Sequence, residues 1–174
     1  MKKIGLLSDT HGYLDPRIFE YFGKCDEIWH AGDIGDEAVS EQLNNFKALK
    51  AVYGNIDGQN IRAIHPEDQV FFCEEVKVFI THIGGYPGNY FPEAGKKILE
   101  HKPDLFICGH SHILKVMRDT KHNLLHINPG AAGKSGFHKM RTIVRFEING
   151  KRIENLEVIE LGLRGEISEP TSLE

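Results

Sequence analysis

Short apolar runs that each stop at a metal-capable side chain constrain this chain more than any other feature. Five such runs end at Asp9-x-His11, Asp33, Asn55, His82 and His110-x-His112. Short, continuous apolar runs are typical of buried strands. Because α/β sheets build their sites beyond the carboxyl ends of strands, we expect these side chains to converge there. The pattern predicts an α/β protein with one polar site at that edge.

The first half of the chain alternates strands with helices, and the second half is rich in hairpins. Strands are predicted over 4–7, 27–30 and 49–53, with helices over 16–22, where Asp15 would be the N-cap, and over 36–46. Further strands are expected over 69–72, 76–80, 105–108, 114–118, 124–127, 142–148 and 153–159, with a helix over 92–102. This order indicates two packed mixed sheets with helices outside, in a single domain over 1–163 before a polar tail over 164–174.

Composition narrows the class of protein. The chain has 174 residues, 40% hydrophobic and 26% charged, which fits one globular domain. A net charge of −4 argues against a basic stripe for duplex binding, so no stable nucleic-acid complex is expected. Three cysteines without a CxxC motif favour a reducing compartment. The apolar run over 4–7 is too short for a signal peptide or a membrane span, so we expect a cytoplasmic protein.

The donor set at the strand ends predicts a metal centre. It combines imidazole, carboxylate and amide groups without thiolate, which suits Mn, Fe, Zn, Ni or Co better than Ca. Seven ligands are too many for one tetrahedral ion, whereas two ions about 3.5–4 Å apart and bridged by a carboxylate use them all. Glycine also precedes Asp33, Asn55 and His110, which indicates tight turns and close backbone approaches there.

The ordered motifs resemble those of the calcineurin-like metallophosphoesterase superfamily. They read Asp9-Thr-His11, Gly32-Asp33, Gly54-Asn55, Thr81-His82 and Gly109-His110-Ser111-His112. Over residues 1–148 the chain is similar to the small single-domain branch of bacterial and archaeal phosphodiesterases. The resemblance implies a four-layer αββα sandwich and two divalent ions, with Mn preferred and Ni, Fe, Zn or Mg as alternatives. It assigns one ion to Asp9, His11 and His112, the other to Asn55, His82 and His110, and the bridge to Asp33.

One position departs from the family pattern. The histidine that usually follows the Gly-Asn pair and protonates the leaving group is Ile56 here. The resemblance implies attack by a metal-bridging hydroxide, with Asp33 and Asn55 as catalytic residues and Asn55 also contacting phosphate. His30 is a substitute proton donor or a packing residue. Asp57 orients a ligand histidine or shapes a turn.

The resemblance favours a metal-dependent phosphoric ester hydrolase, with phosphodiesters preferred to monoesters. Its substrate would be a small phosphate ester, and a homo-oligomer is compatible with the sequence. The competing hypothesis is a catalytically weak metal-binding scaffold of the Vps29 type, which shares this compact form.

Two loop segments are candidate rims of the site. The glycine-rich segment 84–88 follows His82 and carries Tyr86, with Tyr90 shortly after it. A basic segment offers Lys134, His138, Lys139 and Arg141 for phosphate or, alternatively, as a solvated charge run.

Overall fold

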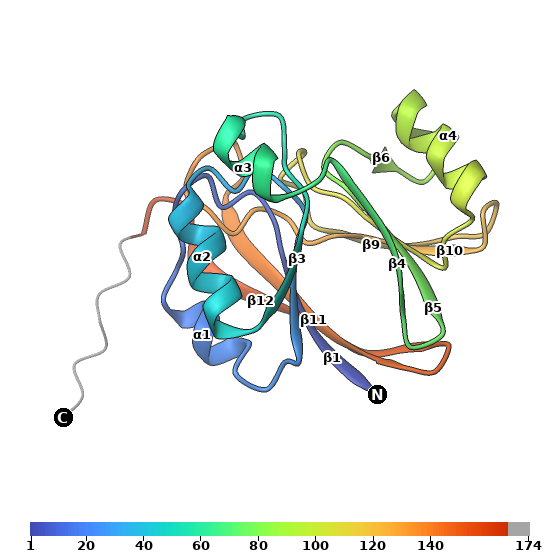
Figure 1. The fold of residues 1–174 in the computed structure, drawn as a ribbon, viewed down its shortest axis with the longest axis horizontal. Helices are drawn as coiled ribbons and strands as arrows, with labels where there is room; N and C mark the ends of the chain where they lie inside the picture. Colours follow the sequence, from blue (N-terminus) through green and yellow to red (C-terminus); the bar gives the residue numbers. More distant parts are fainter. Residues whose placement is uncertain (167–174) are drawn as a thin grey trace.

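The computed structural model describes residues 1–166, in which two five-stranded mixed sheets pack face to face (Figure 1). The first sheet has the order β12-β11-β1-β2-β3, with strands Arg152–Leu163, Met140–Asn149, Lys2–Leu7, Glu27–His30 and Ala48–Ala51. The second has the order β4-β5-β8-β10-β9, with strands Asp68–Cys73, Val76–Thr81, Leu105–Ile107, Leu124–Asn128 and Lys115–Asp119. A short hairpin, β6 (Gly85–Tyr86) and β7 (Asn89–Tyr90), forms a separate two-stranded sheet.

Parallel pairing brings the carboxyl ends of the central strands to one edge of each sheet. In the first sheet β1, β2 and β3 run parallel, so that Leu7 pairs with His30 and His30 with Ala51. In the second sheet β5, β8 and β10 run parallel, and Ile107 pairs with both Ile80 and Ile127. The loops that follow these strands therefore start at neighbouring points.

Three apolar clusters define four layers. The cluster between the sheets joins strand residues of both, and the rings of Trp29 on β2 and Phe71 on β4 lie 5.1 Å apart there. A second cluster packs helices α1 (Arg17–Tyr21) and α2 (Glu37–Phe46) on the outer face of the first sheet. A third packs α4 (Pro92–His101) on the second sheet, and Figure 1 shows α4 on the opposite side from α1 and α2. The predicted αββα sandwich is confirmed.

Two local predictions fail. The N-cap position of α1 is Pro16, one residue later than predicted, although the buried carboxylate of Asp15 still accepts from the Arg17 backbone N–H at 3.0 Å and also pairs with the side chains of Arg17 and Arg141. Arg141 is 1% exposed, so it is part of this internal ion pair and not of a phosphate-binding rim. The short helix α3 (Gln59–Ile64) and the β6–β7 hairpin were not predicted.

Three further features concern the C-terminal end, the cysteines and the length of the helices. Strand β12 ends at Leu163, directly before the predicted tail, of which residues 167–174 lie outside the described part. The three cysteines are buried free thiols. Among residues 1–166 no helix has the length and apolarity needed to span a membrane.

Candidate metal centre

The structure brings all seven predicted ligands to the strand-end loops. Asp9 and His11 follow β1, Asp33 follows β2, Asn55 follows β3, His82 follows β5, and His110 and His112 follow β8. Six of them fall into two groups able to hold a metal ion, one of Asp9, His11 and His112 and one of Asp33, His82 and His110, each with its ligand atoms within 4.8 Å of one another. The seventh, Asn55, joins the second group, since its Oδ1 lies 2.9 Å from Nδ1 of His110.

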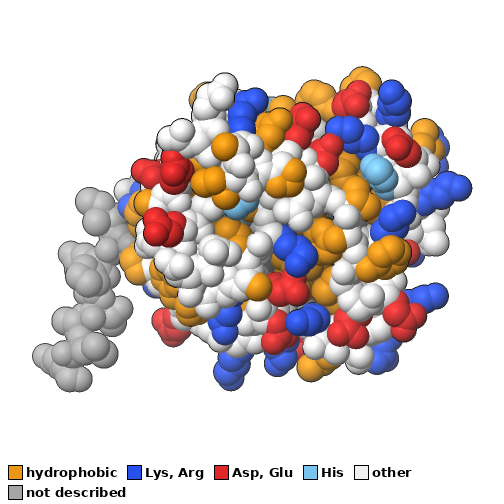
Figure 2. All heavy atoms as spheres, in the orientation of Figure 1, with side chains coloured by type: hydrophobic (Ala, Val, Ile, Leu, Met, Phe, Trp, Pro, Cys, Tyr) orange, Lys and Arg blue, Asp and Glu red, His pale blue; other side chains and the backbone are white. Residues whose placement is uncertain are grey.

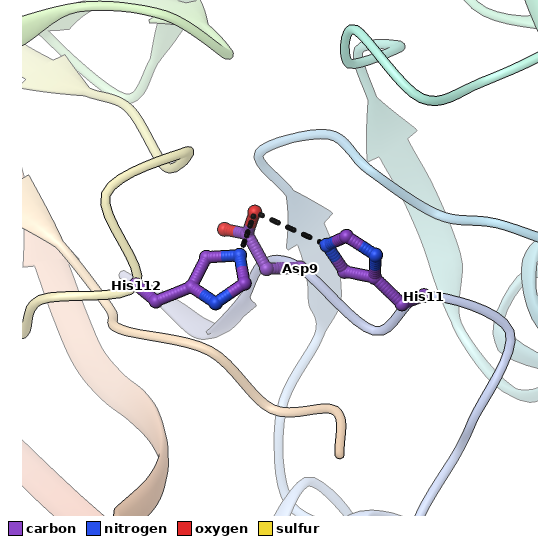
Figure 3. A group of neighbouring side chains, drawn as sticks. All are labelled: Asp9, His11 and His112. Carbon is purple, nitrogen blue, oxygen red and sulfur yellow. Dashed lines mark ion pairs between the residues drawn. The ribbon is translucent and has the colours of Figure 1, made fainter. Parts of the chain in front are cut away.

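In the first group, two imidazoles face one carboxylate oxygen. Figure 3 shows the rings of His11 and His112 on either side of Asp9, each directing a nitrogen at the same oxygen. The distances from Asp9 Oδ1 are 3.9 Å to His11 Nε2 and 3.1 Å to His112 Nε2. The other oxygen, Oδ2, accepts from the Ser8 hydroxyl at 2.6 Å and from the His110 amide at 3.2 Å. One oxygen is thus held by the protein and the other faces the cluster.

Asp33 lies between the two groups. Its Oδ2 is 3.4 Å from Nε2 of His11, in the first group, and 3.2 Å from Nε2 of His82, in the second. Its Oδ1 accepts from the backbone N–H of Ile56 at 3.1 Å. The carboxylate is therefore fixed through one oxygen and directs the other at both groups, which fits a bridging ligand.

Buried atoms without partners indicate what these groups are built to bind. Among the described residues, Asp9 Oδ1, His11 Nε2 and His82 Nε2 are buried and make no hydrogen bond. Such unpaired buried polar atoms are rare, since each costs about 1–3 kcal/mol. All three point into the cluster and belong to residue types that bind divalent metals, so the residues present fit a two-ion centre.

The backbone at these loops is strained. Nine described non-glycine residues have positive φ, and five of them are candidate ligands: Asp9, His11, Asp33, His110 and His112, with φ between 47° and 68°. Single residues in this region typically cost about 1–3 kcal/mol and persist where surrounding structure holds them. The strain turns each side chain out of the strand direction toward the common centre.

Two of the glycines before ligands are required by close approaches. A Cβ on Gly54 would lie 2.0 Å from Oδ1 of Asp33. A Cβ on Gly109 would lie 2.7 Å from Oδ2 of Asp9 and 2.1 Å from the Ser8 hydroxyl oxygen. The predicted role of glycine at these turns is confirmed, because any side chain there would displace a candidate ligand.

Hydrogen bonds orient two of the imidazoles. His82 Nδ1 lies 2.7 Å from the Ala31 carbonyl, which can only accept, so Nδ1 carries the proton and Nε2 has the lone pair. His112 Nδ1 lies 3.1 Å from Nδ1 of His138, whose Nε2 donates to the Gly133 carbonyl at 2.8 Å. His138 thus contacts a candidate ligand through its ring, a role that its place in a basic segment of the sequence did not indicate.

The charges of the centre favour cations. Burial alone would raise the pKa of Asp9, but His11 and His112 hold it well below its ordinary value, and His11 and His82 do the same for Asp33. The carboxylates of Asp33 and Asp9 raise the pKa of His11 to about 9. The pKa of His82 is also raised, because the same carboxylates outweigh its burial. The cluster therefore attracts positive charge, whether protons or metal ions.

His30 lies apart from the open site. It is fully buried, its Nδ1 accepts from the Gly32 amide at 3.1 Å, and its Nε2 lies 3.0 Å from the Thr10 hydroxyl. Burial lowers its pKa to about 4. With both ring nitrogens engaged inside the protein, His30 packs behind the ligand loops, and this geometry does not support a proton donor to substrate.

Asp57 ties two ligand loops together. Its carboxylate accepts from the backbone amides of Ile34 (3.0 Å), Gly35 (2.8 Å) and Gly54 (2.8 Å). These amides adjoin Asp33 on one loop and Asn55 on the other. Asp57 thus positions the backbone of two candidate ligands, and the described contacts do not join it to a histidine.

Two cavities flank the second ligand group. One, of about 510 Å³, is lined by Asn55 and His82 together with Tyr53, Arg62 and Lys97. The other, of about 150 Å³, is lined by His110 together with the β6–β7 hairpin. Phe91 borders both.

Ile56, at the position of the family's histidine, is 47% exposed and offers no proton.

Comparison with known proteins agrees with this arrangement. The model of the calcineurin-like phosphoesterase superfamily domain matches residues 1–151. The chain belongs to this superfamily. The match includes the β1–β11 part of the fold and all seven candidate ligands, and the family uses divalent metals.

Individual relatives share between 17% and 28% of their aligned residues with this chain. A probable metallophosphoesterase of Methanocaldococcus jannaschii is 28% identical over 139 residues, 74% of this chain and 67% of the relative. The structure of a novel archaeal phosphodiesterase has a TM-score of 0.74 at 25% identity and covers 91% of this chain and 99% of its own. Vps29 of Chaetomium thermophilum has a TM-score of 0.73 at 17% identity, covering 92% and 97% respectively, which shows a shared fold.

Proposed function

We propose that this protein is a dinuclear metal-dependent phosphodiesterase. The observation that carries the proposal is the position of Asp33, whose Oδ2 lies 3.4 Å from a histidine of one ligand group and 3.2 Å from a histidine of the other. Two divalent ions held there would supply charge neutralisation at the phosphoryl oxygens and a water of lowered pKa as nucleophile. Manganese is the proposed metal, since the mixed nitrogen and oxygen donors accept it readily.

The chain's own residues prepare the site for this chemistry. The Nδ1 protons of His82 and His112 are held by Ala31 and His138, which keeps their Nε2 lone pairs aimed at the cluster. Asn55 directs its Oδ1 toward the second group, so its amide N–H is the atom left to donate to a phosphoryl oxygen. Prearranged donors of this kind stabilise charge that develops in the transition state.

Two features favour diesters over monoesters. A phosphodiester carries two organic groups, and of the neighbouring residues Asn55 and His110 each lines a different cavity. The position of Ile56 supplies no general acid, so the leaving group must depart without a proton from that residue. We propose that good leaving groups, such as aryl oxides, are the preferred ones.

The proposed substrate is a small phosphate ester and not a nucleic-acid duplex. Figure 2 shows positive and negative side chains interspersed over one face of the molecule, without a broad basic stripe. We further propose that the protein acts in the cytoplasm, without a stable nucleic-acid partner, and that any oligomer it forms is a homo-oligomer.

A metal-binding scaffold is the competing function, favoured by the close fold match to Vps29. The orphaned atoms of Asp9, His11 and His82 argue for metal binding, which both functions share, so turnover is the property that separates them. Metal-stripped protein is assayed on bis(4-nitrophenyl) phosphate and on 4-nitrophenyl phosphate, with and without Mn²⁺. We expect Mn²⁺-dependent turnover that is faster for the diester, and its abolition in Asp33→Asn. Metal binding without turnover favours the scaffold, and Glu41→Gln, an exposed change on α2, is the control.

A further inference from the structure

A cavity beside the metal centre has the character of a binding site for an organic group. It has a volume of about 150 Å³ and is reached from His110, a candidate ligand. Its walls come from the β6–β7 hairpin, from the loop after β8 and from β9 and β10, and include Tyr86, Phe91, Ile113, Lys115, His126 and Asn128. Because the cavity begins at the metal centre, whatever fills it is attached to the phosphate or lies next to it.

His126 on β10 is the unusual member of this lining. The side chain is fully buried, and neither ring nitrogen makes a hydrogen bond of good geometry among residues 1–166. A looser contact with the Phe106 backbone opposes the fall in its pKa but does not satisfy the ring. Burial, reinforced by Lys115, lowers the pKa of His126 to about 4, so the ring is neutral and offers one donor and one acceptor. Buried polar side chains almost always have partners, so an unpaired imidazole in a cavity wall indicates a partner that enters from outside.

The other walls are suited to a flat ring. Tyr86 is 42% exposed, and Nζ of Lys115 lies 3.9 Å from the centroid of its ring. Phe91 is 50% exposed and lines both cavities. The hairpin lies close to the sheet because Gly84 has no side chain: a Cβ there would be 2.6 Å from Phe106 and 2.7 Å from Cys108. Aromatic walls with one cation favour a planar, polarisable occupant.

The volume of the cavity limits the size of the group that it can bind. Sites for whole drug-sized ligands occupy roughly 300–1,000 Å³, so a space of this size holds one ring system of a larger molecule. We propose that it binds a flat heteroaromatic ring on one ester arm of the substrate, with His126 pairing to a hydrogen-bonding edge of the ring. The inference rests on the proposed function, since the phosphate at the metal centre would deliver the ring to the cavity.

The test separates ring binding from phosphate binding. Adenosine, which has the ring but no phosphate, is added to metal-free protein while the ¹⁵N resonances of the His126 ring are followed by NMR. In parallel, adenosine 5′-monophosphate and methyl phosphate are titrated into Mn²⁺-loaded protein by calorimetry. We expect adenosine to shift the His126 resonances, and the nucleotide to bind at least about tenfold more tightly than methyl phosphate, since ring burial and one hydrogen bond each contribute roughly a factor of five.

Two variants and a control complete the experiment. His126→Phe keeps the ring shape and removes both nitrogens, and Tyr86→Ala removes an exposed wall without touching the core. Each is expected to reduce the nucleotide's advantage over methyl phosphate by about fivefold, the share of one hydrogen bond or of ring burial. Phe72→Ala, which removes an exposed aromatic on β4, leaves the ratio unchanged. Equal affinities in the unaltered protein together with unshifted His126 resonances would overturn the proposal. If neither phosphate binds with Mn²⁺ but adenosine still shifts His126, the ring site stands and the proposed function fails.

Discussion

The Nδ1 atoms of His112 and His138 lie 3.1 Å apart, so a single proton is shared between two imidazoles. Because Nε2 of His138 donates to the Gly133 carbonyl at 2.8 Å, its Nδ1 is the acceptor and His112 is the donor. The lone pair of His112 is consequently on Nε2, 3.1 Å from Asp9 Oδ1 and facing the cluster. A residue outside the family's motifs thus sets the tautomer of a candidate ligand.

Replacing His138 tests this orientation. His138→Phe retains a ring of similar shape but no acceptor. The neutral ring of His112 can then carry its proton on either nitrogen. Loss of such a supporting partner typically costs about 10–100-fold in metal affinity, and we expect a loss of that order for one of the two Mn²⁺ ions. Competition with a chelating dye measures it. Lys139→Ala alters the neighbouring exposed side chain and serves as control; equal affinities in His138→Phe and in the control would rule out the positioning role.

Asp57→Asn is expected to loosen two ligand loops together. The substitution leaves at least one of three buried or half-buried amide donors, those of Ile34, Gly35 and Gly54, without an acceptor. An unpaired buried donor costs about 1–3 kcal/mol, so the free energy of unfolding should fall by about that amount in urea titrations. Mn²⁺ affinity should fall in parallel. An unchanged unfolding midpoint, equal to that of Glu41→Gln, would show that Asp57 is an ordinary turn residue.

The metal-free protein should lose stability as the pH rises from about 6.5 to about 9. The pKa of His11 is raised to about 9 by Asp33 and Asp9, so the folded state binds more protons than the unfolded state across this window. Stability falls with rising pH wherever the folded state is the more protonated one. Thermal unfolding at a series of pH values measures the effect, which His11→Gln should reduce but not abolish, because the pKa of His82 is raised by the same carboxylates. A midpoint that rises over the same window in metal-free protein contradicts this charge assignment.

Ile56→His is expected to restore a general acid. The side chain is 47% exposed beside Asn55, and its backbone N–H already anchors Asp33. Such acids contribute about 10²–10⁴-fold, so turnover of an alkyl phosphodiester should rise by up to that factor, while an aryl diester gains little. The ratio of the two kcat/KM values is the readout. Ile64→His, an exposed change on α3 away from both cavities, controls for an added histidine, and equal ratios in both variants would contradict the account.

Much of the fold was predictable because apolar runs and turn residues are local signals. The strand cores, α2 and α4 follow from such patterns, and the layer order follows from the family resemblance. Helix α3 was missed because it has six residues and buries only Ile61, too little for a periodic pattern. The burial of Asp15 and Arg141 was missed because their ion pair spans 126 positions, which no local rule reveals.

The candidate site shows the same division between local and distant signals. The convergence of the seven ligand residues was predictable, since each follows a strand and the family order is distinctive. Supporting residues were not. His138 contacts His112 across 26 positions, and the unpaired state of His126 depends on the packing of Phe106 and Tyr90 around it. The sequence leaves His30 open as a proton donor or a packing residue, and its complete burial places it inside the protein.

The central claim is that Asp33 joins two metal sites into one hydrolytic centre. The most direct measurement titrates metal-free protein with Mn²⁺ while recording hydrolysis of bis(4-nitrophenyl) phosphate at protein concentrations well above the dissociation constants. Our account predicts that activity rises until two equivalents are bound and then levels off, and that Asp33→Asn gives no activity at any ratio. Activity that saturates at one equivalent, or protein that binds two equivalents without hydrolysing the diester, would contradict it.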